Sequence, residues 1–156
     1  MNDLYIKQAD LTRNDHAEIF VSLLNAYLGD PKGAMASDTA RLDRSVADNL
    51  SRLPHAAVFF AKNKSHYVAM AVCFWGFSTF RNQPLLNIHD LIVLPPYRRQ
   101  GIARALLRHI ESVARTQNAC KLTLEVREDN EAAATLYSTC GFADEKVPMR
   151  FRVKYL

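Results

Sequence analysis

The chain has 156 residues, of which 49% are hydrophobic and 23% are charged, and its formal net charge is +4. This composition is typical of a folded globular protein, and the length predicts a single domain over residues 1–156. No apolar run is long enough to span a membrane, and no long basic run favours a nucleic-acid partner. The first residues carry neither a basic segment nor an apolar stretch, which predicts no signal peptide and a cytoplasmic location.

The N-terminal half predicts helices and strands in alternation. Alternating residues at 4–9 predict a first strand, and residues 16–28 carry apolar side chains at helical spacing. A second helix is predicted from about Asp38 to Pro54. Two β-rich runs, 56–62 and 67–77, flank a short polar turn and predict a hairpin.

The C-terminal half predicts a strand–helix–strand unit, which favours a right-handed parallel connection. Its parts are 85–94, 101–117 and 121–126. Asn130 is a good N-cap for a helix that runs to Thr139. Residues 149–156 alternate apolar and basic side chains and predict a last strand. The fold class is therefore α/β (α+β), with a single mixed β-sheet of about six to seven strands and helices on both faces.

The cysteines and most histidines show no catalytic or metal-binding pattern. Three cysteines without metal-ligand spacing indicate reduced, buried thiols and no metal site. Four of the histidines have no partner pattern, and we expect them on the surface or on helix faces. The cysteines are Cys73, Cys120 and Cys140, and the four histidines are His16, His55, His66 and His109.

The most informative segment joins the strand at 85–94 to the helix at 101–117. A double proline at 95–96 ends the strand, a basic loop follows, and Gly101 opens an amphipathic helix whose first acidic residue is Glu111. Free N–H groups, the positive helix end and clustered arginines form an anion site, best suited to phosphate. The alternative is a structural corner in which Gly101 supplies only conformational freedom. Neither a Walker A loop nor a Rossmann fingerprint is present.

Three blocks at and after this loop match known patterns. The first, Arg98-Arg99-Gln100-Gly101-Ile102-Ala103, fits Q/R-x-x-G-x-G/A. The second is the strand at 121–126, and the third runs from Asn130 to Tyr137 before Cys140-Gly141-Phe142, as in N-x-x-A-x-x-L-Y…G-F. From about Ser78 to Phe142 the chain thus resembles the GCN5-related N-acetyltransferase (GNAT) superfamily. Residues 77–80 and the next strand are similar to its diamine (spermidine/spermine-type) branch.

This resemblance implies acetyl-CoA as cosubstrate and a place for it. The strands at 85–94 and 121–126 splay apart, the pantetheine arm pairs with the first of them, and the Val93 amide faces the thioester oxygen. The diphosphate of acetyl-CoA lies on the backbone amides from Arg99 to Arg104. The implied cofactor-binding residues are Leu91, Ile92, Val93, Arg98, Arg99, Gln100, Gly101, Ile102, Ala103, Arg104, Asn130 and Tyr137.

Acetyl transfer to an amine needs an acid for the leaving thiolate and a base for the amine proton. By resemblance, Tyr137 is the acid, and a phenol is protonated at neutral pH. The alternative is that Tyr137 only packs its helix against the sheet. Asn130 caps a helix and, in the family, also contacts the cofactor.

His89 falls on the glutamate with which the diamine-type branch handles the amine proton, and an imidazole changes charge near neutral pH. The alternative is a structural strand histidine, and Glu125 is a weaker candidate base. Because Asp90 follows His89 directly on a strand, we expect their side chains on opposite faces. Phe80 and Arg81, at a predicted strand end, join His89 and Asp90 as candidates for the acceptor site.

These residues predict an acetyl-CoA-dependent N-acetyltransferase that transfers acetyl directly to the primary amine of a small molecule or amino-acid derivative. The alternatives are a protein or peptide N-acetyltransferase and a non-catalytic acyl-CoA-binding module. We expect a homodimer without a metal, nucleic-acid or membrane partner. Histidine in place of glutamate removes a negative charge, so we expect polyamines to be poor acceptors.

Overall fold

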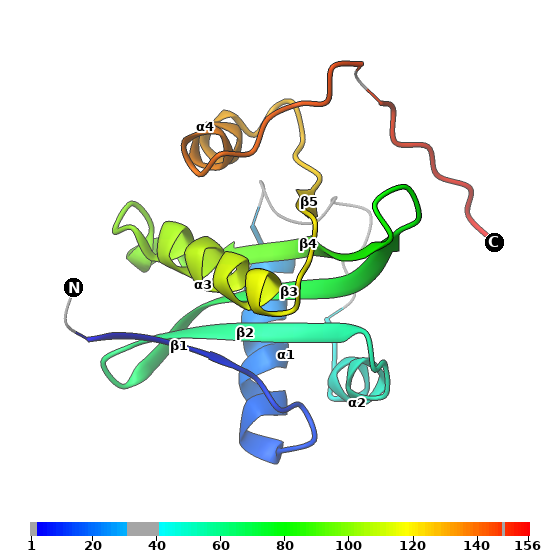
Figure 1. Cartoon of the computed structure of the whole chain (residues 1–156). Coiled ribbons are helices and arrows are strands. Elements are labelled where there is room, and N and C mark those ends of the chain that lie inside the picture. Colours follow the sequence, from blue (N-terminus) through cyan, green and yellow to red (C-terminus); the bar gives the residue numbers. More distant parts are fainter. Residues whose placement is uncertain (1–2, 31–40, 148) are drawn as a thin grey trace. The chain divides into compact units, whose positions relative to one another are not determined.

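A computed structural model describes residues 3–30, 41–147 and 149–156 of the chain. The chain forms two compact units, Met1–Glu125 and Val126–Leu156, and each is described by itself (Figure 1). The first unit contains the whole sheet, and the second contains one helix and an extended C-terminal segment. The single domain inferred from chain length stays a prediction.

The sheet of the first unit is mixed, as predicted, with its strands in chain order across the sheet. Neighbouring strands run antiparallel except the last two, which run parallel and are joined through a helix. The strands are β1 (Leu4–Gln8), β2 (Ala56–Asn63), β3 (His66–Ser78), β4 (Gln83–Val93) and β5 (Leu122–Leu124).

The described residues form fewer strands than predicted, because residues 149–156 have no regular secondary structure. Their alternation supplies one apolar and one basic face, but a strand also needs a neighbouring edge to accept its backbone hydrogen bonds. The described part of the second unit contains no other strand. Its apolar side chains are accordingly exposed, as for Met149 and Phe151, which are 84% and 82% exposed.

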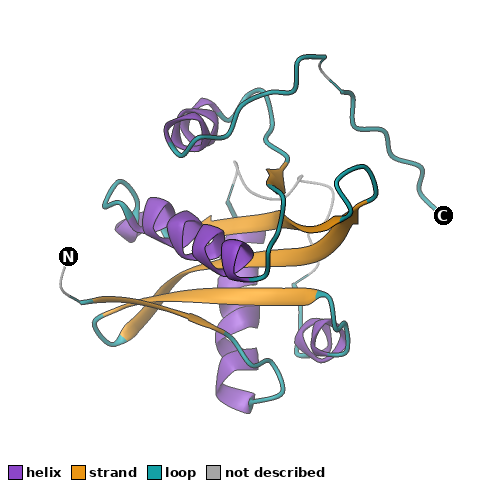
Figure 2. Cartoon of the chain, in the orientation of Figure 1, coloured by secondary structure: helices purple, strands orange, loops and turns teal. Residues whose placement is uncertain are grey.

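Helices cover both faces of the sheet, as the colouring in Figure 2 makes clear. On one face lie α1 (Asn14–Leu28) and α2 (Ser45–Ser51), and on the other lies α3 (Ile102–Thr116). Phe20 of α1 is buried with Phe60 and Met70 in the first layer. On the opposite layer, His109 of α3 meets Phe59 edge-on at 5.7 Å between ring centroids. Burial of each large apolar side chain contributes about 1.5–3 kcal/mol.

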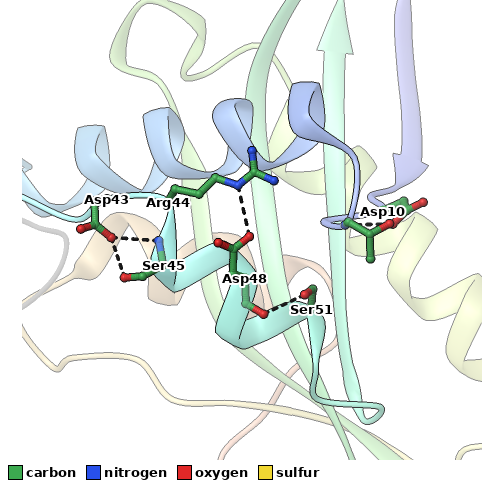
Figure 3. Close-up of polar contacts among 7 residues, drawn as sticks. Asp10, Asp43, Arg44, Ser45, Asp48 and Ser51 are labelled. Atoms are coloured by element: carbon green, nitrogen blue, oxygen red, sulfur yellow. Dashed lines mark hydrogen bonds and ion pairs between the residues drawn. The ribbon is translucent and has the colours of Figure 1, made fainter.

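Helix α2 is shorter than predicted, and the predicted start near Asp38 lies outside the described residues. Local polar contacts hold its first turn (Figure 3). The Asp43 carboxylate accepts hydrogen bonds from the Ser45 amide at 2.8 Å and from its hydroxyl at 2.5 Å, which lowers the pKa of Asp43. Arg44 pairs with Asp48 one turn later at 3.1 Å. These contacts supply the helix start that the apolar pattern did not locate.

His16 lies on a face of helix α1, but the expectation that it has no partner was wrong, because this histidine is buried and hydrogen-bonded. Its Nδ1 accepts the Asp10 N–H at 2.9 Å, and its Nε2 lies 2.8 Å from Lys7 Nζ. The ring also meets Phe60 edge-on at 5.7 Å between centroids. Helical periodicity starting at His16 was the available signal, because it places this residue on the inner face of α1.

Candidate active site

The edge of β4 opens just where the predicted thioester site lies. Parallel pairing with β5 covers only Leu86–Ile88 opposite Leu122–Leu124. Strand β4 continues to Val93. Strand β5 ends at Leu124, so in the described part of the chain no strand pairs with this edge of β4 from His89 onward. The splaying of two longer strands stays a prediction.

Backbone direction decides which groups face this open edge. The Leu94 N–H donates to the Val68 carbonyl at 2.9 Å, toward β3. Because successive residues of a strand direct their backbone groups to opposite edges, Val93 and Leu91 present theirs to the open side. Ile92 directs its backbone groups to Met70 on β3. Of the three residues predicted to pair with the pantetheine arm, only Leu91 and Val93 therefore have backbone groups on the open side, and the Val93 carbonyl there accepts from Arg98 Nε.

A β-bulge in β4 lies at His89 and Asp90. Asp90 is opposite Val72, and Ile88 is opposite the next β3 residue, Cys73, so His89 is the extra residue. Asp90 therefore shares the face of Val72, which belongs to the core under α1 and α2. The His89 ring meets Phe74, also of that face, at 5.5 Å between centroids.

The expectation of opposite faces for His89 and Asp90 was thus wrong, because the bulge adds a residue and breaks the strict alternation. Both side chains point to the α1–α2 face, directly beside the open edge of β4. Burial raises the pKa of Asp90, and the positive charge that His89 can carry opposes this shift. Burial also raises the pKa of the neighbouring Cys73 to about 12, with the Asp90 charge adding to it, so this thiol is unreactive.

We expect Asp90→Asn to stabilise the protein near neutral pH. The pKa of Asp90 is higher in the folded protein than in the unfolded chain, where it is about 4. The free energy of unfolding therefore falls as the pH rises from the unfolded pKa to the folded pKa, and stays lower above it. Asparagine removes this cost. Thermal unfolding should show a higher midpoint for the variant at neutral pH and little difference in acid. The exposed Asp144→Asn is the control, and an unchanged or lower midpoint at neutral pH would contradict the burial cost.

The loop between β4 and α3 has the geometry of an anion site. Arg99 and Gly101 both take left-handed backbone conformations, with φ of 63° and 80°. Gly101 is the N-cap of α3, whose first turn contains no acidic residue. A Cβ added at Gly101 would meet no atom within 4 Å, so the space beside this Cα is open. Left-handed turns at a helix start aim successive N–H groups outward, which suits a phosphate group.

Arg98 has partners inside the protein. Its Nε donates to the Val93 carbonyl at 2.9 Å, and its Nη2 pairs with the Asp30 carboxylate just after α1. Sequence reasoning missed Asp30, because 68 residues separate it from Arg98. Gln100 donates to the Pro96 carbonyl at 3.0 Å, which closes the loop on itself.

Other predicted site residues lie away from the bulge. Phe80 and Arg81 are exposed in the turn between β3 and β4. This turn is roughly 20 Å along the strand from His89, at about 3.3 Å per residue. The structure therefore does not bring the predicted acceptor wall to the bulge. Glu125, the reserve base, follows β5 and is exposed, with one carboxylate oxygen 3.5 Å from Asn87 Nδ2.

The second unit carries Asn130 and Tyr137. Asn130 caps α4 (Glu131–Thr139), and its side chain accepts from the Ala133 amide at 3.3 Å, which confirms the predicted cap. Tyr137 packs edge-on against Phe142 at 5.9 Å between ring centroids. Phe142 follows Gly141, whose φ of 89° turns the chain back after the helix. The roles of Asn130 and Tyr137 toward acetyl-CoA stay predictions.

Comparison with known proteins identifies the family. A family model described as the acetyltransferase (GNAT) family matches residues 17–142. The chain belongs to the GNAT family. It is 25% identical over 132 residues to thialysine N-epsilon-acetyltransferase from Caenorhabditis elegans, a match that covers 83% of this chain and 79% of the relative. It is 38% identical over 78 residues to an N-alpha-acetyltransferase from Sulfurisphaera tokodaii, a match that covers 47% of each chain.

Solved GNAT structures show the same fold. The crystal structure of a probable acetyltransferase superimposes with a TM-score of 0.81 at 19% identity, covering 97% of this chain and 98% of that chain. Family membership makes this GNAT protein an acetyl-CoA-dependent N-acetyltransferase. The open edge of β4 and the left-handed loop are features that fit this cosubstrate. In the described residues, no helix is long and apolar enough to cross a membrane.

Proposed function

We propose that the GNAT enzyme transfers acetyl directly from acetyl-CoA to the primary amine of a small molecule or amino-acid derivative. The observation that carries the proposal is the bulge, which puts His89 and Asp90 on one face beside the open edge of β4. An amine held there would lie next to the thioester, and proximity of this kind supplies several kcal/mol of the barrier reduction. The thialysine enzyme among the relatives, whose name indicates a small amine acceptor, supports this class.

In the proposed reaction, each proton has a place. The imidazole of His89 takes a proton from the amine, directly or through water, and the Val93 amide donates to the thioester oxygen as charge develops on it. The loop amides around Gly101 hold the diphosphate. Tyr137 donates its phenol proton to the leaving thiolate. Asp90 holds the acceptor's ammonium group or orients the imidazole.

Polyamines are poor acceptors under this proposal. His89 stands where the diamine-type branch has a glutamate, so one carboxylate is missing from the acceptor site. Burial also opposes the ionisation of Asp90, whose pKa is raised. A site for a polycation should instead be lined by ionised carboxylates.

A thiol-release assay with acetyl-CoA and an amine panel tests the proposal. The panel contains amino-acid amines such as thialysine and lysine, the polyamine spermidine, and peptides with free N-termini. Turnover with a small amine above all peptides would support it. The best rate on a peptide would favour the protein or peptide N-acetyltransferase, for which the N-alpha relative is the supporting observation. Binding of CoA without turnover on any amine would favour the non-catalytic module.

We expect His89→Gln to remove the acidic limb of the pH–rate profile. A protonated imidazole cannot take a proton, so kcat/KM of the wild-type enzyme should fall on the acid side of its pH profile. Glutamine keeps hydrogen bonding but does not titrate, so the variant should be slower and independent of pH there. CoA affinity should stay unchanged. The exposed His66→Gln is the control, and an unaltered profile in His89→Gln would exclude His89 as the base.

The predicted homodimer and cytoplasmic location also remain proposals. Light scattering of the purified protein would measure its mass in solution. A mass equal to one chain would contradict the dimer. Fractionation of cells that express the tagged chain would test the location.

A further inference from the structure

A salt bridge ties the end of α1 to the loop between β4 and α3. Asp30 follows the last residue of α1 by two positions, and its carboxylate pairs with the guanidinium of Arg98. The Asp30 side chain is 13% exposed and that of Arg98 is 43% exposed. Ion pairs of this kind are worth more than pairs in open solvent, because water screens them less. The pair therefore constrains the guanidinium.

The position of Asp30 does not favour α1 itself. The carboxyl end of a helix carries partial negative charge, so a carboxylate there is repelled. The last turn of α1 contains no basic residue that could offset this repulsion. Arg98, from the loop between β4 and α3, supplies the compensating positive charge. An aspartate at this place is therefore explained better by its contact with Arg98 than by helix stability.

The same guanidinium group also holds one peptide group, the one between Val93 and Leu94. Arg98 Nε donates to the Val93 carbonyl at 2.9 Å. The Leu94 N–H of the same peptide group donates to the Val68 carbonyl at 2.9 Å. This peptide group is thus fixed from both edges of the strand. The adjoining N–H of Val93, which faces the open edge, is fixed with it.

We propose that Asp30 is a positioning residue for acetyl transfer, because it anchors Arg98 on the Val93 carbonyl and so holds the Val93 amide in place. The inference rests on the proposed function, in which this amide faces the thioester oxygen. A donor aimed at developing charge is effective only when it is held in advance. Asp30 acts through Arg98 and touches no reacting atom. The guanidinium, once anchored in this way, is not primarily a diphosphate ligand.

Kinetics of Asp30→Asn provide the first test. We expect kcat to fall about tenfold, since small displacements of aligned groups cost such factors. Affinity for CoA, measured by calorimetry, should not fall, because the diphosphate amides of the loop remain and the freed guanidinium keeps its charge. Arg98→Gln should lower kcat to a similar degree, and the double variant should be no slower than the slower single variant. The control is Asp15→Asn, which breaks an exposed Arg–Asp pair at the other end of the same helix.

Amide hydrogen exchange gives a readout that needs no turnover. The Leu94 amide should exchange about tenfold faster in Asp30→Asn than in wild type, because its peptide group loses one of its two constraints. If no amine is acetylated by the wild type, the proposed function fails and this measurement still tests the anchor. Wild-type kcat together with wild-type exchange at Leu94 would overturn the inference. A loss of CoA affinity in Arg98→Gln with unchanged kcat would overturn it too, and would make Arg98 a diphosphate ligand.

Discussion

Gly101→Glu is expected to abolish binding of CoA to a folded enzyme. Gly101 has a φ of 80°, and a Cβ there would meet no atom within 4 Å, so the first side-chain atom clashes with nothing. The left-handed backbone costs a non-glycine residue about 1–2 kcal/mol, which a folded domain tolerates. The new carboxylate, however, lies at the start of α3 and competes with the diphosphate for the same amides. Calorimetry should show affinity reduced by at least about 100-fold, or about 2.7 kcal/mol.

Two variants separate charge from strain in this experiment. Gly101→Ala brings the backbone strain without the charge, and we expect a smaller loss of CoA affinity. Gly141→Glu introduces the same backbone strain and the same negative charge at a glycine of the second unit whose φ is 89°. We expect its CoA affinity to stay close to that of the wild type. A folded Gly101→Glu that binds CoA as tightly as wild type would remove the diphosphate assignment from this loop.

Tyr137→Phe is expected to lower kcat about 100-fold, with little change in the KM for acetyl-CoA. Loss of a general acid typically costs a factor of about 10²–10⁴ in rate. Phenylalanine keeps the ring that packs on Phe142, so the variant should stay folded, which thermal unfolding checks. The decisive measurement is kcat with an acceptor for which chemistry limits the rate.

Tyr155→Phe is the matched control, because Tyr155 is an exposed tyrosine of the same unit. Its kcat should equal that of wild type. If Tyr137→Phe also turns over at the wild-type rate, the hydroxyl is not the acid, and Tyr137 is a structural residue. A fall in both kcat and the unfolding midpoint would likewise indicate a structural residue.

Local patterns were sufficient for most elements of this chain. The apolar spacing of the segment after Gly101 predicted α3, whose inner face buries Ile102, Leu106 and Ile110. Helix caps and strand alternation are decided by neighbouring residues, so β2, β3 and the Asn130 cap followed from the same reasoning. The predicted strand at residues 149–156 is absent. Apolar and basic side chains alternate there, but the described part of the same unit offers no strand edge for pairing. The expectation that His16 has no partner was also wrong, because its partners come from β1 and the turn after it.

The sequence by itself determined the family, the basic loop before α3 and the residue types of the candidate site, because these depend on short segments with a fixed order. Only the tertiary structure decided which side of the sheet those side chains point to and which groups they contact. The bulge that turns His89 and Asp90 to one side exists only in the register of β4 against β3. The open amide of Val93 depends on β5 ending at Leu124, and the anchor of Arg98 depends on α1 bringing Asp30 across the fold. Such contacts join segments far apart in the chain, and no local pattern encodes them.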